Sequence, residues 1–358
     1  MISFQRRSGS SLGWNVVCYS AAMLGALLAS TVLLRLSGGD PAKAFSSLLI
    51  GAFGSQGALL GSLAKATPLL LVGLGTVFAF RAKIWNIGQE GQVFAGAMAA
   101  YWVSFWIAPL PGWLAVCTLA VAGMVGGGAL GLLAGALKTR FGTSEIISTV
   151  MLNYIVMYLL AYLLDGGPWM ATGVTVSYHQ SPPIDPSLEW PVLFGIGAGK
   201  LHVGILFALA ASAFSSILLD KTSLGYEIRA FGSNPTALTF RGTNVPRLLL
   251  TVMLLSGALA GLAGAGELFG VSHRLRAETL LGIGSSGIVV AMVGGLRPSG
   301  VMIAALFFGA LESGTIYMRL KSGTPAGLVS AMEGMVLLFF LSAAVATRLQ
   351  IVRREVHA

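Results

Sequence analysis

The segment R-A-K-I-W-N-I-G-Q-E-G-Q, residues 81–92, decides how the rest of the chain is interpreted. Apolar runs flank it, residues 67–80 before it and residues 93–108 after it. Polar backbone at membrane depth survives only where protein or a water-filled path covers it, and glycines allow a helix to unwind. The pattern predicts a helix broken near residues 86–92, a device from which solute paths are built. An ordinary cytoplasmic turn with solvated side chains is the alternative that the pattern leaves open.

The composition is that of a helical membrane protein. Of the 358 residues, 55% are apolar and only 10% are charged, whereas soluble domains carry roughly 25% charged residues. Several stretches reach the roughly 20 apolar residues that a membrane span needs. We therefore expect an all-α integral membrane protein, a single transmembrane domain of about ten helices over residues 1–358. The expected spans are residues 14–36, 64–80, 93–108, 112–137, 145–164, 201–219, 248–270, 282–295, 301–318 and 326–346.

Three segments are expected to lie outside the spans. Residues 165–200 are polar and proline-rich and predict a long external loop. Residues 220–247 are charged and predict two short cytoplasmic helices joined by a turn. Residues 41–62 predict an external helix that lies on the surface or dips into it. With ten spans both termini share one side, and fourteen of the 22 Lys and Arg residues fall there, so both termini are predicted to be cytoplasmic.

The net charge and the cysteines limit the kinds of partner and site that we expect. A net charge of +9 is explained by the basic residues of cytoplasmic loops, so membrane lipid is the expected surroundings and no nucleic-acid partner is expected. Cys18 and Cys117 both fall inside apolar spans and predict no disulfide framework. The four histidines are scattered without the spacing of a metal site. We expect no metal.

A glycine ladder runs through the expected span at residues 112–137. Its members are four residues apart and share one helix face, which allows another helix to approach closely. We interpret the ladder as helix packing without solute contact. The members are Gly123, Gly127, Gly131 and Gly135.

A polar face marks the expected span at residues 145–164. Glu145, Thr149 and Asn153 are four residues apart and therefore lie on one side of a helix. The face predicts either the lining of a path or hydrogen bonds that lock two helices together, and the sequence leaves both open. The residues we expect beside a solute path are Asn86, Gln89, Glu90, Gln92, Glu145 and Asn153.

No nucleotide site is found in the chain's own motifs. Residues 282–287 match G-x-G-x-x-G, but they stand in an apolar run without a preceding strand. Residues 195–200 end in Gly-Lys but are one residue short of a phosphate loop, and Leu201 stands where Ser or Thr is needed. No catalytic arrangement of carboxylates or of Ser, His and Asp stands out. We therefore expect no enzyme activity and no bound cofactor.

Five segments carry a family resemblance. They are N-I-G-Q-E-G-Q at 86–92, F-G-T-S-E-I-I-S-T-V-M-L-N-Y at 141–154, G-Y-E-I-R-A-F-G-S-N-P-T-A at 225–237, S-G-A-L-A-G-L-A-G at 256–264 and G-I-V-V-A-M-V-G at 287–294. Together they resemble the permease subunits of ABC importers in the branched-chain amino acid and simple-sugar group. The form of the first segment is most similar to the nucleoside and simple-sugar subgroup.

The resemblance implies a function and its partners. Two permeases, the same chain twice or two related chains, form the path in the bacterial plasma (inner) membrane. ABC ATPase subunits that use ATP dock on the cytoplasmic coupling segment 220–247, and an extracytoplasmic binding protein delivers the solute. One departure is that Ser285 and Ser286 stand where the family often has an acidic residue. The residues assigned to ATPase coupling are Glu227, Arg229, Asn234, Pro235 and Arg241.

Two other functions remain open at this point. An ion-coupled secondary transporter is one, because membrane carboxylates often serve proton or sodium relays. A structural membrane subunit without a path is the other. The carboxylates that an ion-coupled transporter would use are Glu90, Glu145, Glu267, Glu312 and Glu333.

Overall fold

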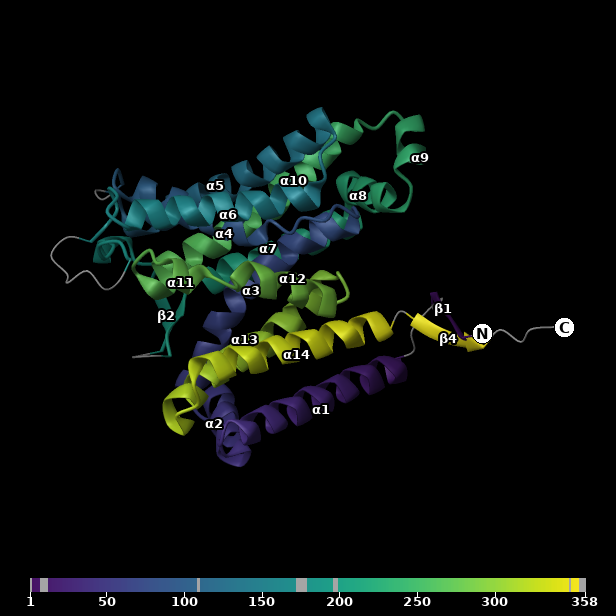
Figure 1. Ribbon diagram of the computed structural model, residues 1–358. Coiled ribbons are helices and arrows are strands. Elements are labelled where there is room, and N and C mark those ends of the chain that lie inside the picture. Colours follow the sequence, from purple (N-terminus) through teal and green to yellow (C-terminus); the bar gives the residue numbers. More distant parts are fainter. Residues whose placement is uncertain are drawn as a thin grey trace. The chain divides into compact units, whose positions relative to one another are not determined.

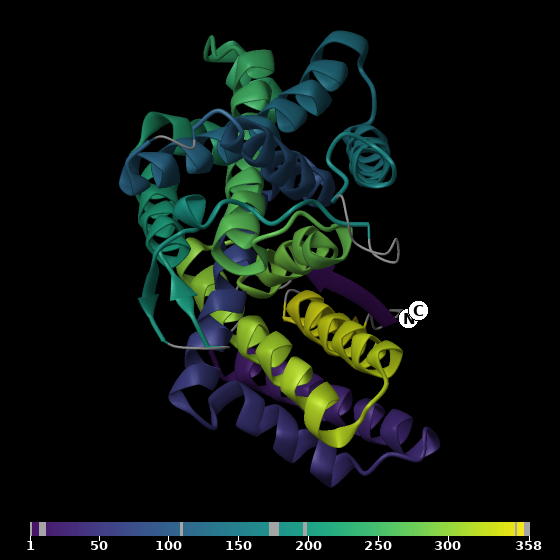
Figure 2. The same ribbon diagram turned by 90° about the vertical axis from the view of Figure 1, so that its left-hand side faces the viewer.

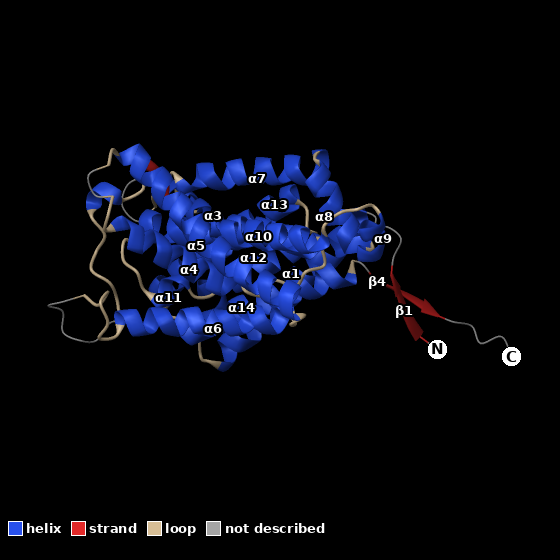
Figure 3. Ribbon diagram, turned by 90° about the horizontal axis from the view of Figure 1, so that it is seen from above, coloured by secondary structure: helices blue, strands red, loops and turns tan. Residues whose placement is uncertain are grey.

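Helices make up most of the described structure (Figure 3). The computed structural model describes residues 2–6, 12–107, 110–171, 179–195, 199–347 and 349–353. Within these residues, eight helices are long and apolar enough to cross a membrane, which confirms the all-α membrane class. Helix α4 has 16 residues, or about 24 Å of helix, and α12 is shorter still. The number of spans and the side of the termini stay predictions.

The chain divides into two compact units. The first comprises Met1–Ala58 with Leu311–Ala358, and the second is Leu59–Ala310. The unit boundaries fall near the start of α3 and within α13. The prediction of one domain is neither confirmed nor contradicted by this division, and each unit is described by itself.

In the first unit, α1 packs beside α14 (Figures 1 and 2). Strands β1 and β4 pair antiparallel, with Ile2 opposite Arg353. Leu34 of α1, Ala44 of α2 and Met318 of α13 meet Val329 and Met332 of α14 in a buried cluster. The elements are β1 Ile2–Arg6, α1 Leu12–Leu36, α2 Pro41–Phe53, the end of α13, α14 Ala326–Ala346 and β4 Leu349–Arg353.

Residues 41–62 form two helical segments where the sequence predicted one external helix. The Asp40 carboxylate accepts a hydrogen bond from the Ala42 N–H at 3.0 Å and begins α2. The helix ends at Phe53, and the Ser55 hydroxyl accepts from the Ala58 N–H at 3.1 Å. This second cap starts α3 eight residues before the expected span, so the apolar helix is longer than predicted.

The second unit holds the break and everything that surrounds it. Its helices before the long loop that follows α6 are α3 Gln56–Arg81, α4 Gln89–Ser104, α5 Gly112–Phe141 and α6 Glu145–Leu164. The loop contains η1 Pro186–Leu188, β2 Val192–Phe194 and β3 Leu201–His202. The remaining elements are α7 Gly204–Lys221, α8 Ser223–Ser233, α9 Pro235–Phe240, α10 Val245–Glu267, the π-helical turn η2 Leu268–Ser272, α11 Ala277–Leu280, α12 Ile283–Val293 and α13 Pro298–Ser322.

Helices α4, α5 and α10 pack against one another (Figure 1). The glycine ladder of α5 supplies the contact with α10, because a Cβ atom on Gly127 would lie 2.6 Å from Gly261 Cα. Gly96 of α4 meets the same Gly261 from the other side. Such backbone contact is typical of helices that associate through small residues. The backbones of α4, α5 and α10 are therefore in close contact around Gly261.

The loop between α6 and α7 is hydrogen-bonded at several described residues to the segment that follows α10. The Trp190 N–H donates to Phe269 O at 2.9 Å, and the Ile184 N–H donates to His273 O at 3.0 Å. Strands β2 and β3 form a short antiparallel pair (Figure 2). The expected span at 201–219 begins later than predicted, because residues 201–202 belong to β3 and α7 starts at Gly204. Residues 172–178 and 196–198 of this loop lie outside the described residues.

Candidate functional site

The chain leaves helical geometry between α3 and α4. Helix α3 ends at Arg81, and α4 begins at Gln89. Lys83 has a positive φ of 54°, a left-handed conformation that ends helices. The break therefore covers residues 82–88, four residues earlier than the predicted 86–92, and Gln89 to Gln92 form the first turn of α4.

A buried amide cluster closes the break. Asn86 is 0% exposed; its Nδ2 donates to Gln92 Oε1 at 3.0 Å and to Ser256 Oγ at 2.9 Å. Asn86 Oδ1 accepts from the Gly88 N–H at 3.0 Å and from Gln92 Nε2 at 3.2 Å. Gln89 Nε2 donates to the same Ser256 Oγ at 2.8 Å. In this conformation Asn86 and Gln92 bind each other, and Asn86 and Gln89 both bind Ser256 of α10. Contact of the three amides with solute stays a prediction.

Asn153 fastens the break to α6. Its Nδ2 donates to Ile87 O at 3.0 Å, and its Oδ1 accepts from the Gly91 N–H at 2.8 Å. The Gly91 amide lies in the first turn of α4, where backbone N–H groups lack helical partners. Asn153 is half-buried, so the interhelical lock that the polar face suggested is present. The lining role that the sequence also left open stays a prediction.

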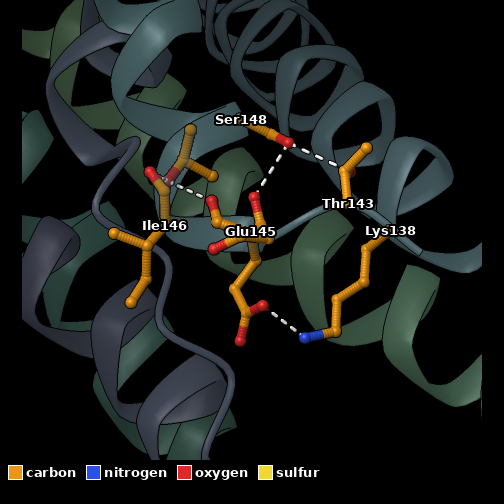
Figure 4. Close-up of polar contacts among 7 residues, drawn as sticks. Lys138, Thr143, Glu145, Ile146 and Ser148 are labelled. Atoms are coloured by element: carbon orange, nitrogen blue, oxygen red, sulfur yellow. Dashed lines mark hydrogen bonds and ion pairs between the residues drawn. The ribbon is translucent and has the colours of Figure 1, made fainter. Parts of the chain in front are cut away.

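Glu145 lies at the start of α6 and binds Lys138 of α5 (Figure 4). The hydroxyl oxygens of Thr143 and Ser148 lie 3.1 Å apart beside this pair. Lys138 and Glu145 flank the short loop between the two helices, so their ion pair fixes how α6 leaves α5. Glu145 also lies beside the break, because the backbone of Trp85 interacts with its carboxylate, and its contact with solute stays a prediction.

Glu90 reaches a different helix. Its Oε1 accepts a hydrogen bond from the Gly282 N–H, and its Oε2 accepts one from the Ser285 N–H at 3.0 Å. The two amides belong to the start of α12, whose own first turn carries no acidic residue. Glu90 of α4 therefore places a carboxylate at the start of α12.

The predicted coupling segment forms two short helices, as expected. Thr222 accepts from the Gly225 N–H at 3.2 Å and caps α8, and α9 begins at Pro235 after Asn234. The Arg241 guanidinium lies 4.8 Å from the centre of the Tyr226 ring. Glu227 and Arg229 are half-buried on α8.

Helix α8 contacts the chain immediately before the break, which the sequence did not reveal. A Cβ atom on Gly232 would collide with Arg81 O and lie 3.4 Å from Ala82 C. Arg81 Nε donates to Leu296 O at 2.8 Å, and its Nη1 lies 3.8 Å from Asp220 Oδ1. Arg81 thereby joins the end of α3 to the segments before α8 and after α12. A basic residue in the last turn of an apolar helix is the only sequence signal for this role.

Other carboxylates of the ion-coupled hypothesis have partners of their own. Glu267 is buried and lies 3.6 Å from Lys65 Nζ. Glu333 accepts a hydrogen bond from the Thr315 hydroxyl. These contacts are structural in type and provide no specific support for an ion relay.

His202 is a buried histidine that the sequence did not single out. Its Nδ1 accepts from the Gly204 N–H at 3.1 Å, and its ring centre lies 5.9 Å from that of Trp190. Cβ atoms on Gly204 or Gly270 would meet the imidazole ring. Burial, and secondarily the charge of His273, lower the pKa of His202 to about 4.

Acidification is expected to destabilise the protein through His202. Because its folded pKa lies below the ordinary value of about 6.5, the unfolded chain binds the proton first. Stability from this group is intact above about pH 6.5, falls as the pH decreases, and levels off below about pH 4, a total of about 3 kcal/mol. The thermal midpoint of the purified protein, measured from pH 7.5 to 4, should show this fall. In the His202→Gln protein the thermal midpoint should depend less on pH over this range. The same dependence on pH in both proteins would contradict the prediction.

The site as a whole combines three features. An apolar helix breaks inside a helical bundle, buried amides close the break, and a charged pair of short helices contacts it from outside the apolar spans. These features define a multi-pass membrane transport subunit of the permease class. The family model described as branched-chain amino acid transport system / permease component matches residues 58–341. The chain belongs to this family.

Named relatives extend over nearly the whole chain. It is 35% identical to a guanosine ABC transporter permease protein of Bacillus subtilis, covering 90% of this chain and 91% of that protein. It is 30% identical to a nucleoside ABC transporter permease protein of Lactococcus lactis, covering 89% and 88%. It is 31% identical to a glucose ABC transporter permease protein of Haloferax volcanii, covering 89% and 85%. The protein is accordingly a multi-pass permease of the bacterial inner membrane.

Proposed function

We propose that this chain forms the solute path of an ATP-driven importer for nucleosides or related simple sugars. The names of the three relatives support that class of solute. In this proposal an ABC ATPase subunit binds and hydrolyses ATP, a second permease completes the path, and an extracytoplasmic protein delivers the solute. The second permease is the same chain or a related one.

The contact between α8 and the break is the observation that carries the proposed coupling. Gly232 meets the carbonyl of Arg81 with no side chain between them. Residues 82–88 begin directly after that carbonyl. A displacement of α8 by a docked ATPase would therefore reach the break without passing through a flexible side chain. On its exposed side, a pocket of about 360 Å³ is lined by Ser223, Tyr226, Glu227 and Arg241 and offers a place for a partner side chain.

The mechanism we infer is alternating access. ATP binding closes the ATPase pair, α8 and α9 move with it, and the amide cluster around Asn86 exchanges its internal bonds for others. Solute hydroxyl or base-edge groups are suitable replacements, because both donate and accept hydrogen bonds as amides do. The solute shifts the equilibrium only by binding the two conformations with different affinity. Asn86, Gln89 and Gln92 are the residues we assign to this exchange.

Charge reversal at Arg229 tests the coupling assignment. Arg229→Glu should release the ATPase from the purified complex and lower ATP-driven nucleoside uptake by about tenfold or more, since a reversed charge at a docked surface repels the partner. Co-purification of a protein with a phosphate loop from native membranes gives the first readout. Uptake of radiolabelled nucleoside into vesicles gives the second.

The matched control is Arg276→Glu, which reverses an exposed charge before α11. Both variants must elute as single peaks, so that loss of the ATPase is not a loss of folding. If Arg229→Glu keeps the ATPase and the uptake rate of the parent protein, α8 is not the coupling element. If the parent chain itself purifies repeatedly without an ATPase, the importer assignment fails.

A further inference from the structure

Two helix N-termini meet at Glu90. Helix α4 begins at Gln89 and α12 begins at Ile283, both within the second unit. A Cβ atom on Gly284 would run into the backbone of Glu90 and lie 2.6 Å from its Oε2. The first turns of the two helices are therefore in backbone contact, and no larger residue fits between them.

The meeting point is electrostatically unusual. Each helix N-terminus carries the equivalent of roughly half a positive charge, because its first N–H groups lack helical partners. Helix α12 has no acidic residue in its first turn, and its N-cap Gly282 provides no side-chain cap. Two positive ends packed together at this half-buried place would repel each other unless an anion lay between them.

Glu90 supplies that anion. It belongs to the first turn of α4, and its two oxygens accept from separate N–H groups of the α12 start, those of Gly282 and Ser285. One carboxylate thus serves both helices. Carboxylates at helix N-termini stabilise them, more so where they are partly buried.

We propose that Glu90 is a positioning residue whose negative charge joins α4 to α12 and occupies the place where a helix-bound solute anion would otherwise sit. This inference deepens the proposed function and rests on it for the location of the path. Its consequence is that the path presents no free helix N-terminus here to phosphate or carboxylate groups, which suits an uncharged solute. Helix N-termini that are left free in transporters receive anionic solute groups.

Chemical rescue of a Glu90→Ala variant tests whether the charge of the Glu90 carboxylate matters or only its shape. Nucleoside uptake by the importer that carries Glu90→Ala should fall about tenfold. Sodium formate should restore much of this uptake, because formate fills the gap with a carboxylate. Formamide has the same size without the charge and should not rescue. Sodium gluconate, too large for the gap, matches the ionic strength. Formate should have no effect on the parent protein, where Glu90 already fills the place.

Two further variants make the test specific. Glu90→Gln keeps the side chain's shape but replaces one acceptor by a donor, so it should lose uptake and gain nothing from formate. Glu278→Ala removes an exposed carboxylate from α11 and should behave as the parent does. Equal rescue by formamide, or a Glu90→Gln protein with the parent's rate, would overturn the proposal.

A readout without transport separates this proposal from the importer assignment. Formate should raise the thermal midpoint of purified Glu90→Ala protein, and formamide should not. If this shift appears while the parent imports no nucleoside, the role of Glu90 stands and the proposed function fails. If the parent imports nucleoside but the variant shows no formate-specific shift in midpoint or uptake, the proposed function stands and the role of Glu90 fails.

Discussion

Replacing Gly127 by alanine should strongly lower the yield and the thermal midpoint of the folded protein, whereas the same replacement at Gly135 should be tolerated. Both glycines belong to the α5 ladder and share a helix face. They differ in what a new Cβ atom would meet. At Gly127 it would lie 2.6 Å from Gly261 Cα and 2.7 Å from Gly261 N. At Gly135 its nearest neighbours are side-chain atoms, Leu250 Cδ2 at 3.2 Å and Met253 Cβ at 3.3 Å.

The difference between backbone and side chain decides the size of the effect. The methyl groups of a leucine side chain can move by a few tenths of an ångström at little cost, but a helix backbone moves only as a whole. Gly261 also touches Gly96 of α4, so separating α5 from α10 disturbs all three helices. Overpacking in protein cores costs about 1–3 kcal/mol and sometimes more. We expect the upper end of that range at Gly127 and less than about 1 kcal/mol at Gly135.

The yield of monodisperse protein after detergent extraction and its thermal midpoint measure the effect. Gly112→Ala, where a Cβ meets nothing within 4 Å, controls for the loss of glycine flexibility in α5. The prediction fails if Gly127→Ala and Gly135→Ala shift the midpoint equally. Gly127→Ser should behave like Gly127→Ala, because the added hydroxyl does not remove the Cβ atom.

The location of the break was predictable, but its boundaries were not. Polar residues and glycines between apolar runs predicted it from the sequence. The sequence pattern did not show that Gln89 to Gln92 are helical, because the partners that make this possible are remote. Asn153 binds Gly91 across 62 residues, and Glu90 binds Ser285 across 195. Local periodicity carries no information about such contacts.

The role of the glycine ladder was also predicted only in part. Spacing of four predicted close helix packing on one face, and it did not identify the partner, which is α10 through Gly257 and Gly261. Nor did it rank the four glycines, since Gly135 meets side chains while Gly127 meets backbone. The role of Gly232 against Arg81 was invisible for the same reason. A glycine's packing role depends on what lies opposite, which only the tertiary structure supplies.

Removal of the Asn86 side chain is the second change with a large expected effect. Asn86→Ala deletes both hydrogen bonds to Gln92, the bond to Ser256 and the acceptor of the Gly88 N–H. Asn86 is 0% exposed and Gln92 is 1% exposed, so water does not readily replace these bonds. A buried polar group left unpaired costs about 1–3 kcal/mol. With several groups stranded, we expect about 3 kcal/mol or more.

A double-mutant cycle with Ser256 distinguishes a connected cluster from independent bonds. Ser256→Ala should be milder, because Asn86 keeps its three other hydrogen bonds. The double variant should lose less than the sum of the two, with a coupling of about 0.5–3 kcal/mol. Asn244→Ala is the matched control: it removes the cap that accepts from the Arg247 N–H at 3.1 Å and should cost about 1 kcal/mol. Additive effects in denaturant or heat unfolding would show that the amides act separately.

The same variant bears on transport, because the cluster holds the break in one of its conformations. If the amides only stabilise the fold, Asn86→Ala and Ser256→Ala should lose uptake in proportion to the stability that each loses. If they exchange their bonds with solute, Asn86→Ala should lose uptake beyond that proportion, because it removes a donor and an acceptor that the solute would bind. A common proportion for both variants would remove Asn86 from the solute path and leave it a structural residue of the break.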